Sequence, residues 1–401
     1  MGLTNRQIFL ANMAQTSPSP MLMEVVSAKG VELYGSNGEV WIDLISGISV
    51  SSVGHSHPKV VDAVCRQSEK YMHLMVYGEL VLSPQTTLAR DLTALLPVML
   101  DSCYFVNSGS EAMEGAMKLA KRFTGRPGIV AFHDAYHGST QGALSIIGSE
   151  YFRRSYRPLL PAVEHLNYGV EEQLELIDHN TACVVVEMVR GEAGAVDGDW
   201  NFIRKLYERC KLTGTLFVVD EIQSGFFRTG PFMAFMDAGI VPDILVLGKA
   251  MGGGMPMGAF VANKSLMSSL INQPVLGHIT TFGGHPVCSA AATSALEVLK
   301  EIGRESIDQK ALLFRRLLTH ERINSITGKG LMMGVDLGTE EFNKKVIDVC
   351  LSKGVFTDWF LFAPHKMRIA PPLVISESEI EKACLIILAS IDEVAKMDFN
   401  H

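Results

Sequence analysis

Charged residues are scarce in this chain of 401 residues, in which Asp, Glu, Lys and Arg make up 19% and hydrophobic residues 47%. Such a composition excludes a disordered chain and predicts a sizeable core, in one large domain or two. Basic tracts are lacking as well, and the formal net charge is -8. Nucleic acid is therefore not an expected partner.

Cysteine is sparse and scattered, with no Cys-x-x-Cys pair and no metal-ligand spacing among the seven cysteines. We therefore predict no metal site, and reduced thiols as in a cytoplasmic protein. No apolar run is long enough to span a membrane, and the N-terminal segment 1–6 lacks the apolar core of a signal peptide. These absences predict a soluble, cytoplasmic protein without a membrane partner.

The pattern of predicted strands and helices changes after about residue 57. Before it, an N-terminal arm leads into two short strands, 31–34 and 40–43, around an Asn-Gly turn that is typical of a hairpin. After it, apolar strands alternate with helices, which predicts an α/β fold with a mainly parallel sheet covered by helices. The expected helices are 58–72, 84–96, 110–123 and 200–213, and the expected strands 102–106, 128–132, 182–187, 215–219, 244–247 and 258–262.

A smaller α+β unit is expected beyond residue 286. A long helix to about residue 303 is followed by helix 305–320, strand 331–337, and helices 341–353 and 376–396. We therefore predict a division into 1–45 (arm and part of a small domain), 46–286 (large domain) and 287–401 (the rest of the small domain).

The most informative residue is Lys249, which follows the apolar run 244–247 and precedes a glycine-rich stretch. Another apolar strand ends at Asp220. Ligands of an open parallel sheet bind at the carboxyl ends of its strands. A lysine buried there tends to lose its proton and can form a Schiff base with an aldehyde, while the carboxylate can hold a proton on a pyridine ring. The alternatives are a solvated loop lysine and a helix-capping aspartate.

Other polar groups also follow predicted strands. The Ser-Gly-Ser turn 108–110 opens a helix and can bind a phosphate, although it can equally be an ordinary helix cap. Tyr136 can stack on a planar ring or simply end a surface loop. Arg190 and Glu192 lie beside a flexible Gly/Ala turn, where they can bind a substrate or simply be charged residues of a surface loop.

Taken in the order of the chain, these motifs closely resemble those of the class III subgroup of the fold-type I pyridoxal phosphate aminotransferases. This subgroup includes acetylornithine, ornithine and 4-aminobutyrate aminotransferases. The likeness runs from the Gly-His-Ser-His-Pro segment 54–58 to the Met-Arg-Ile-Ala-Pro-Pro segment 367–372, and 218–258 is its most specific stretch. The resemblance implies a large domain of the aspartate aminotransferase type and a small α+β domain built from both ends of the chain.

The resemblance also implies which residues hold the cofactor, pyridoxal phosphate. Lys249 would bind it covalently and later move a proton, and Asp220 would keep its ring nitrogen protonated. The remaining contacts would come from Ser108, Gly109 and Ser110 at the phosphate, Tyr136, His137 and Ile222 at the ring, and Gln223 at the ring oxygen. Thr281 would reach the phosphate of the neighbouring subunit, so a homodimer would share its two sites.

For the substrate, the resemblance implies that Arg368 pairs with a carboxylate and that Glu192 pairs with Arg368 when no carboxylate is bound. In ornithine-type members an arginine follows the aromatic-His-Gly motif, but this chain has Ser139 there. A hydroxyl cannot replace a bidentate guanidinium. Arg190 stands where glutamine is usual, and we hypothesise that it supplies the missing cation.

The implied activity is ping-pong transamination from an ω-amino acid, a diamine or an acylated diamino acid to 2-oxoglutarate or pyruvate. One alternative is an aminomutase on the same scaffold, similar to glutamate-1-semialdehyde aminomutase. A nicotinamide oxidoreductase is a second alternative, but the Gly-x-Gly-x-x-Gly turn it needs is not convincingly present. A non-catalytic metabolite-binding protein is a third.

Overall fold

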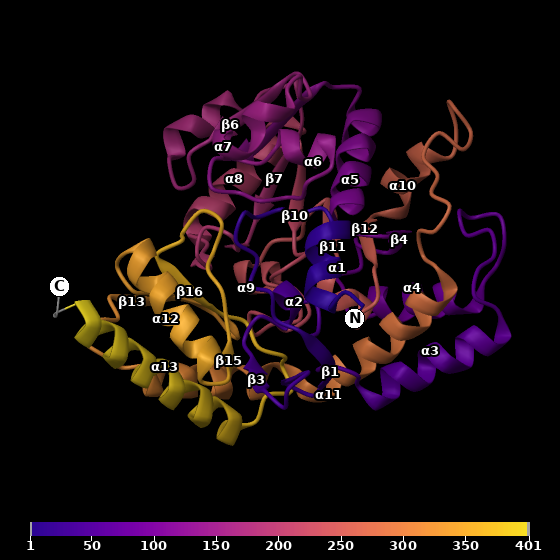
Figure 1. Ribbon diagram of the computed structural model, residues 1–401. Coiled ribbons are helices and arrows are strands. Elements are labelled where there is room, and N and C mark those ends of the chain that lie inside the picture. The colour runs from indigo at the N-terminus through magenta and orange to yellow at the C-terminus, as the bar shows by residue number, and fades with distance from the viewer. Residues whose placement is uncertain (1, 399–401) are drawn as a thin grey trace.

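A seven-stranded mixed sheet forms the centre of the fold (Figure 1). The computed structural model describes residues 2–398. The sheet has the order β4-β12-β11-β10-β7-β5-β6, and β12 runs antiparallel to both of its neighbours while the other pairs are parallel. Its strands are β4 (Ser102–Val106), β5 (Gly128–Phe132), β6 (Val163–Leu166), β7 (Thr181–Glu187), β10 (Leu216–Asp220), β11 (Ile244–Leu247) and β12 (Gly258–Ala262).

Helices cover both faces of this sheet because its strands are apolar on both sides. Successive side chains of a strand point to opposite faces, and neighbouring residues such as Val218 and Val219 belong to two different hydrophobic clusters. The predicted fold class is therefore confirmed. The helices of this part are α2 (Ser46–Ser49), α3 (Pro58–Lys70), α4 (Ser83–Thr93), α5 (Gly109–Thr124), α6 (Gln141–Ser145), α7 (Glu150–Arg153), α8 (Trp200–Thr213), α9 (Phe235–Ala238) and α10 (Lys264–Met267).

Two smaller sheets lie outside this one, and the first of them combines strands from both ends of the chain. In the first, β1 (Val25–Lys29), β2 (Glu32–Gly35) and β3 (Val40–Asp43) are joined by the late strand β15 (Val355–Phe356). The second contains β13 (Ser325–Lys329), β14 (Met332–Asp336) and β16 (Lys366–Ile369). Helices α12 (Glu340–Ser352) and α13 (Glu377–Asp398) lie beside them in yellow and orange in Figure 1. The predicted domain boundaries stay a prediction.

Helix α11 (Pro286–Leu317) contains the two helices predicted for this region, joined across a kink. The break lies at Gly303, which has φ 66° and ψ 170°. That conformation is essentially restricted to glycine. The remaining α-helix is α1 (Asn5–Asn12), and β8 (Val189–Arg190) and β9 (Val196–Asp197) form a small hairpin; short 3-10 helices span Arg154–Tyr156, Glu171–Leu176, Lys249–Gly252 and Ser268–Leu270. Within residues 2–398, no helix has the length and apolar character needed to cross a membrane.

Candidate active site

A cavity of about 240 Å³ lies at the carboxyl ends of the central strands. It brings together residues that are far apart in the sequence but follow β4, β5, β7, β10 and β11 in the same sheet. All the predicted cofactor residues except Thr281 line it. The full lining is Ser108, Gly109, Ser110, Tyr136, His137, Gly138, Glu187, Asp220, Ile222, Gln223 and Lys249.

Asp220, the last residue of β10, is held by two hydrogen bonds. Its Oδ2 lies 2.7 Å from Nδ1 of the buried His137, and its Oδ1 accepts from the Ile222 amide at 2.9 Å. Burial alone lowers the pKa of His137, but the hydrogen bond and the charge of Asp220 outweigh it, and the pKa is raised. The imidazole therefore orients the carboxylate, whose oxygens still have lone pairs free for a further donor.

Lys249 begins a short 3-10 helix, Lys249–Gly252, which is separated from the end of β11 by Gly248 alone. Its backbone is left-handed, with φ 47°, a conformation that costs a non-glycine residue about 1–3 kcal/mol and clusters at functional sites. Burial lowers the pKa of the amine; the Glu192 carboxylate opposes this and the Arg368 guanidinium adds to it. The environment thus favours a neutral, nucleophilic amine.

The turn between β4 and α5 presents a helix N-terminus to the cavity. Ser108 caps α5, with its Oγ accepting from the Glu111 amide at 3.2 Å. Ser110 Oγ accepts from the Ser139 amide at 3.0 Å, which ties this turn to the Tyr136 loop. A Cβ at Gly138 would lie 1.9 Å from Ser110 Oγ, so only glycine permits this approach. Free amide groups at a helix N-terminus are suited to a phosphate.

The residues that line the cavity fit pyridoxal phosphate. Tyr136 supplies an aromatic ring and Ile222 an apolar side chain to the same cavity, as a flat ring between two faces requires. The Gln223 Nε2 is buried without a hydrogen-bond partner and lines the same cavity, so it is available to an oxygen of a bound group. A phosphate site, a carboxylate and an amine complete the set.

Glu192 and Arg368 form a buried bidentate ion pair beside this cavity. The Nη1 and Nη2 groups of Arg368 donate to the two oxygens of Glu192, each at 3.1 Å. Burial raises the pKa of Glu192, but the charge and hydrogen bonds of Arg368 outweigh it, and the pKa is lowered. Lys249 adds to the lowering, so the pair lies within electrostatic reach of the amine. The two residues expected to act as one substrate switch are therefore in contact.

Arg190 and Thr281 lie elsewhere. The Arg190 guanidinium stacks on the Tyr168 ring, 4.4 Å from its centroid, and its Nη1 lies 3.3 Å from Asp134 Oδ2. It is not among the residues that line the cavity, and its role toward a second carboxylate stays a prediction. Thr281 is exposed in a segment that also exposes 55% of Phe282. Its contact with a neighbouring subunit likewise stays a prediction.

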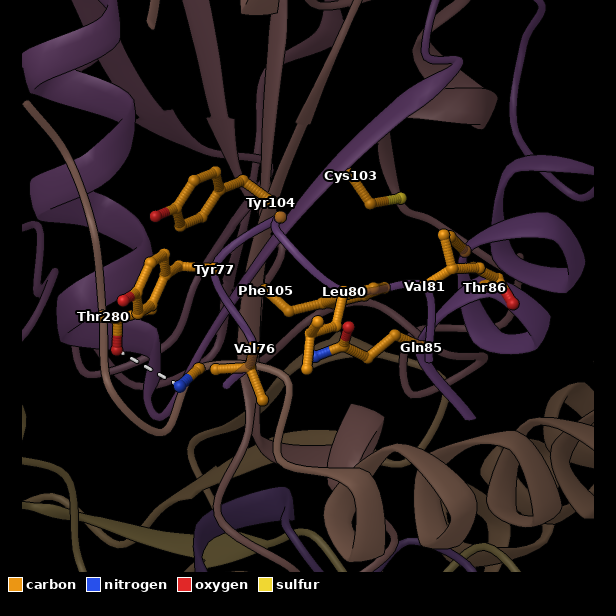
Figure 2. A pocket seen from close by; sticks show the side chains of 13 residues that line it. Val76, Tyr77, Leu80, Val81, Gln85, Thr86, Cys103, Tyr104, Phe105 and Thr280 are labelled. Carbon is orange, nitrogen blue, oxygen red and sulfur yellow. Dashed lines mark hydrogen bonds between the residues drawn. The ribbon is translucent and has the colours of Figure 1, made fainter. Parts of the chain in front are cut away.

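A second cavity, of about 300 Å³, lies beside the Thr281 segment (Figure 2). Side chains of the 76–86 stretch, including Tyr77 and Gln85, surround it together with residues of β4 and Thr280. Thr280 Oγ1 accepts from the Gly283 amide at 3.2 Å and so shapes the turn that carries Thr281. Several side chains at its rim are exposed and apolar, among them Leu80 and Val81.

Glu187 is a site residue whose contacts the sequence did not indicate. It ends β7, lines the cavity, and accepts from the Tyr136 amide at 3.3 Å and the Gly191 amide at 3.0 Å. One carboxylate thus joins the loop that carries Tyr136 to the turn that carries Glu192. Burial raises its pKa to about 7. In the sequence, only the position of Glu187 at a strand end indicated a role in the site, because the fold determines which amide groups it contacts.

The comparison with known proteins decides the family. The sequence model described as "Aminotransferase class-III" matches residues 13–391. The chain belongs to the class-III aminotransferases. It is 40% identical over 365 residues to the acetylornithine aminotransferase of Methanopyrus kandleri, covering 90% of this chain and 92% of that one. It is 35% identical to the [LysW]-aminoadipate semialdehyde/glutamate semialdehyde transaminase of Sulfurisphaera tokodaii, over 79% of this chain and 82% of that one.

A solved structure agrees with these relatives. The ornithine aminotransferase of Toxoplasma gondii, whose active site has partial occupancy of pyridoxal phosphate, superimposes with a TM-score of 0.88 at 27% identity. The match covers 97% of this chain and 93% of that one. This class-III aminotransferase is accordingly a pyridoxal phosphate-dependent transaminase. The aminomutase alternative is not favoured, since the named relatives are aminotransferases.

Proposed function

We propose that the enzyme moves the terminal amino group of an ω-amino acid, a diamine or an acylated diamino acid to 2-oxoglutarate or pyruvate. The observation that carries this proposal is the bidentate Glu192–Arg368 pair beside the cavity. With Arg368 neutralised, the site accepts an uncharged donor end, and with Glu192 displaced, the guanidinium binds the carboxylate of the oxo acid. The names of the relatives support acylated donors.

Ser139 bears on the choice of donor and acceptor. Its backbone amide donates to Ser110 and its hydroxyl lies 3.0 Å from the Tyr136 hydroxyl. It therefore offers no charge to a far carboxylate of the substrate. This supports pyruvate as an acceptor beside 2-oxoglutarate, and donors whose far end carries no carboxylate that needs an arginine.

The cofactor would be held by the residues that line the cavity. When bound, pyridoxal phosphate supplies an aldehyde that exchanges amino groups and a ring that withdraws electrons from the substrate carbon. Asp220, oriented by His137, would hold a proton at the ring nitrogen. Ser108, Gly109 and Ser110 would bind the phosphate, Tyr136 and Ile222 would enclose the ring, and Gln223 would donate to the ring oxygen.

Lys249 would have two tasks. Its neutral amine would bind the cofactor covalently, and once a substrate amine has displaced it, its Nζ would take the proton from the substrate carbon and return it to the cofactor carbon. Both tasks need a deprotonated amine, and burial lowers the lysine pKa in the required direction. The cavity walls would exclude water while the proton moves.

The test is an absorbance scan of the holoenzyme during addition of single amines. We expect an acylated diamino acid, an ω-amino acid or a diamine to bleach the visible band, and pyruvate or 2-oxoglutarate to restore it. Lys249→Ala is the control, because it can bind the cofactor without a covalent link and should show no such cycle. If no donor of these classes bleaches the band, or if product forms without consumption of an oxo acid, the proposal is wrong.

We also propose a homodimer with shared active sites, located in the cytoplasm. The exposed Phe282 and Ile279, close to Thr281 in sequence, support an apolar subunit interface there. Mixing inactive Lys249→Ala with Thr281→Glu should restore activity, since one site of each hybrid has both native residues. Dimers seen by light scattering without any recovery would contradict shared sites. The free cysteines support a reducing compartment, which cell fractionation would check.

A further inference from the structure

Arg368 has a second carboxylate partner, Asp358, to which neither the sequence motifs nor the switch assigns a role. Arg368 Nε donates to Asp358 Oδ1 at 2.7 Å, and the arginine and aspartate side chains are only 3% and 18% exposed. Arg368 Nη2 also donates to the Trp359 carbonyl at 3.1 Å, and the guanidinium lies 4.3 Å from the centroid of the Phe360 ring. Consecutive residues 358–360 therefore surround the guanidinium.

Asp358 is fixed to Arg368 through the backbone. The Arg368 amide donates to the Asp358 carbonyl at 2.9 Å, and Thr357 Oγ1 donates to the Arg368 carbonyl at 2.6 Å. The aspartate and the arginine thus belong to one paired piece of chain and move together. This backbone pairing does not involve the groups at Nη1 and Nη2.

Glu192 lies in the Gly191–Gly194 turn on another part of the chain. Its carbonyl accepts from the Phe362 amide at 3.0 Å, and its side-chain Oε2 accepts from the Leu361 amide at 3.1 Å in addition to Arg368. A substrate carboxylate can take its place at Nη1 and Nη2 with the same bidentate geometry. Two carboxylates therefore share one guanidinium, and only Asp358 belongs to the piece of chain that is paired with the Arg368 backbone.

We propose that Asp358 is a specificity-determining residue that keeps Arg368 electrically neutralised after Glu192 has left. A substrate carboxylate then forms hydrogen bonds to a neutral Arg368–Asp358 ion pair and does not meet a free cation. This inference rests on the proposed role of Arg368. With Glu192 in place, the three side chains carry a net charge of -1, and with Glu192 displaced the net charge is zero. The open site therefore holds a carboxylate weakly and releases it readily, which favours donors without a carboxylate at this end.

The test compares binding of glutarate, a dicarboxylate without an amino or oxo group, to the wild type and to Asp358→Asn. Asparagine keeps an oxygen acceptor for Arg368 Nε but removes the charge. Calorimetry at pH 8, on both the cofactor-free protein and the holoenzyme, should give a Kd about tenfold lower for the variant, as expected for a charge removed at this range. The KM for 2-oxoglutarate should fall, whereas the KM for a carboxylate-free amine should not.

Two further variants make the outcome decisive. Asp392→Asn removes one negative charge at an exposed site that pairs with His320, and should leave glutarate binding unchanged. Asp358→Glu restores the charge and should return the Kd toward that of the wild type. An unchanged or higher Kd in Asp358→Asn, with an unaltered Tm, would overturn the inference. If Arg368→Gln also leaves glutarate binding unchanged, the proposed role of Arg368 itself fails, which is a separate result.

Discussion

At the scale of a single residue, the proposed chemistry depends on the charge of Asp220. Its side chain is buried, and its carboxylate is held from two sides, by His137 Nδ1 and by the Ile222 amide. A buried carboxylate is tolerated where it is hydrogen-bonded and can meet a positive charge. The arrangement therefore suits a proton held on a ring nitrogen within the cavity.

Asp220→Asn removes this charge while it keeps an oxygen for His137. We expect kcat to fall about 10²–10⁴-fold, the scale at which positioned electrostatic and proton-transfer groups act. Steady-state transamination with saturating cofactor is the measurement. Asp243→Asn is the matched control, because Asp243 accepts from Lys211 and the Phe217 amide away from the cavity lining. Turnover near that of the wild type in Asp220→Asn would refute the assigned role.

The residues that could be predicted from the sequence share one property: each directly follows an apolar strand or opens a helix. Lys249, Asp220 and the 108–110 turn have this property, and the fold brings all of them to one cavity. Asp358 has no such signal, because its role comes from contact with Arg368 in a hairpin of short, irregular strands. Arg190 shows the converse, since a suggestive position in the sequence did not bring its side chain to the cavity.

At the scale of elements, the buried strands of the central sheet were predictable because they are short apolar runs between helices. Strands β4, β5, β11 and β12 have the predicted bounds. Strand β16 was missed because its sequence, Lys-Met-Arg-Ile, alternates charge with apolar residues, yet all four residues are buried. Tertiary partners decide this: Arg368 is paired with Glu192 and Asp358, and Lys366 lies 3.4 Å from Thr327 Oγ1.

Edge strands were missed for a related reason. Strand β1 has only exposed or half-buried residues, and it owes its conformation to pairing with β2 instead of to burial. The break in α11 could be predicted because Gly303 is a single-residue signal that acts locally. Pairing between distant segments, such as β15 with β3, depends on the whole chain and leaves no local pattern.

At the scale of the whole molecule, burial of acidic groups links stability to pH. Glu221 follows Asp220, is fully buried, and accepts from Ser224 Oγ at 2.6 Å and from the Phe235 amide at 2.8 Å. Burial raises its pKa to about 7. Between its unfolded pKa and about 7, the folded state binds a proton that the unfolded state has released, so this group lowers stability as pH rises.

Glu221→Gln should remove that dependence, because the amide keeps an acceptor for Phe235 and has no charge to bury. We expect the free energy of unfolding of the variant, relative to the wild type, to rise by about 2.5 kcal/mol between pH 5 and pH 8. Urea unfolding of the cofactor-free protein, at one fixed protein concentration because subunit association also stabilises, measures the difference. Glu393→Gln is an exposed control that pairs with Lys353 and should show no such slope. A constant difference between Glu221→Gln and wild type across this range would mean that the carboxylate is ionised in the fold without penalty.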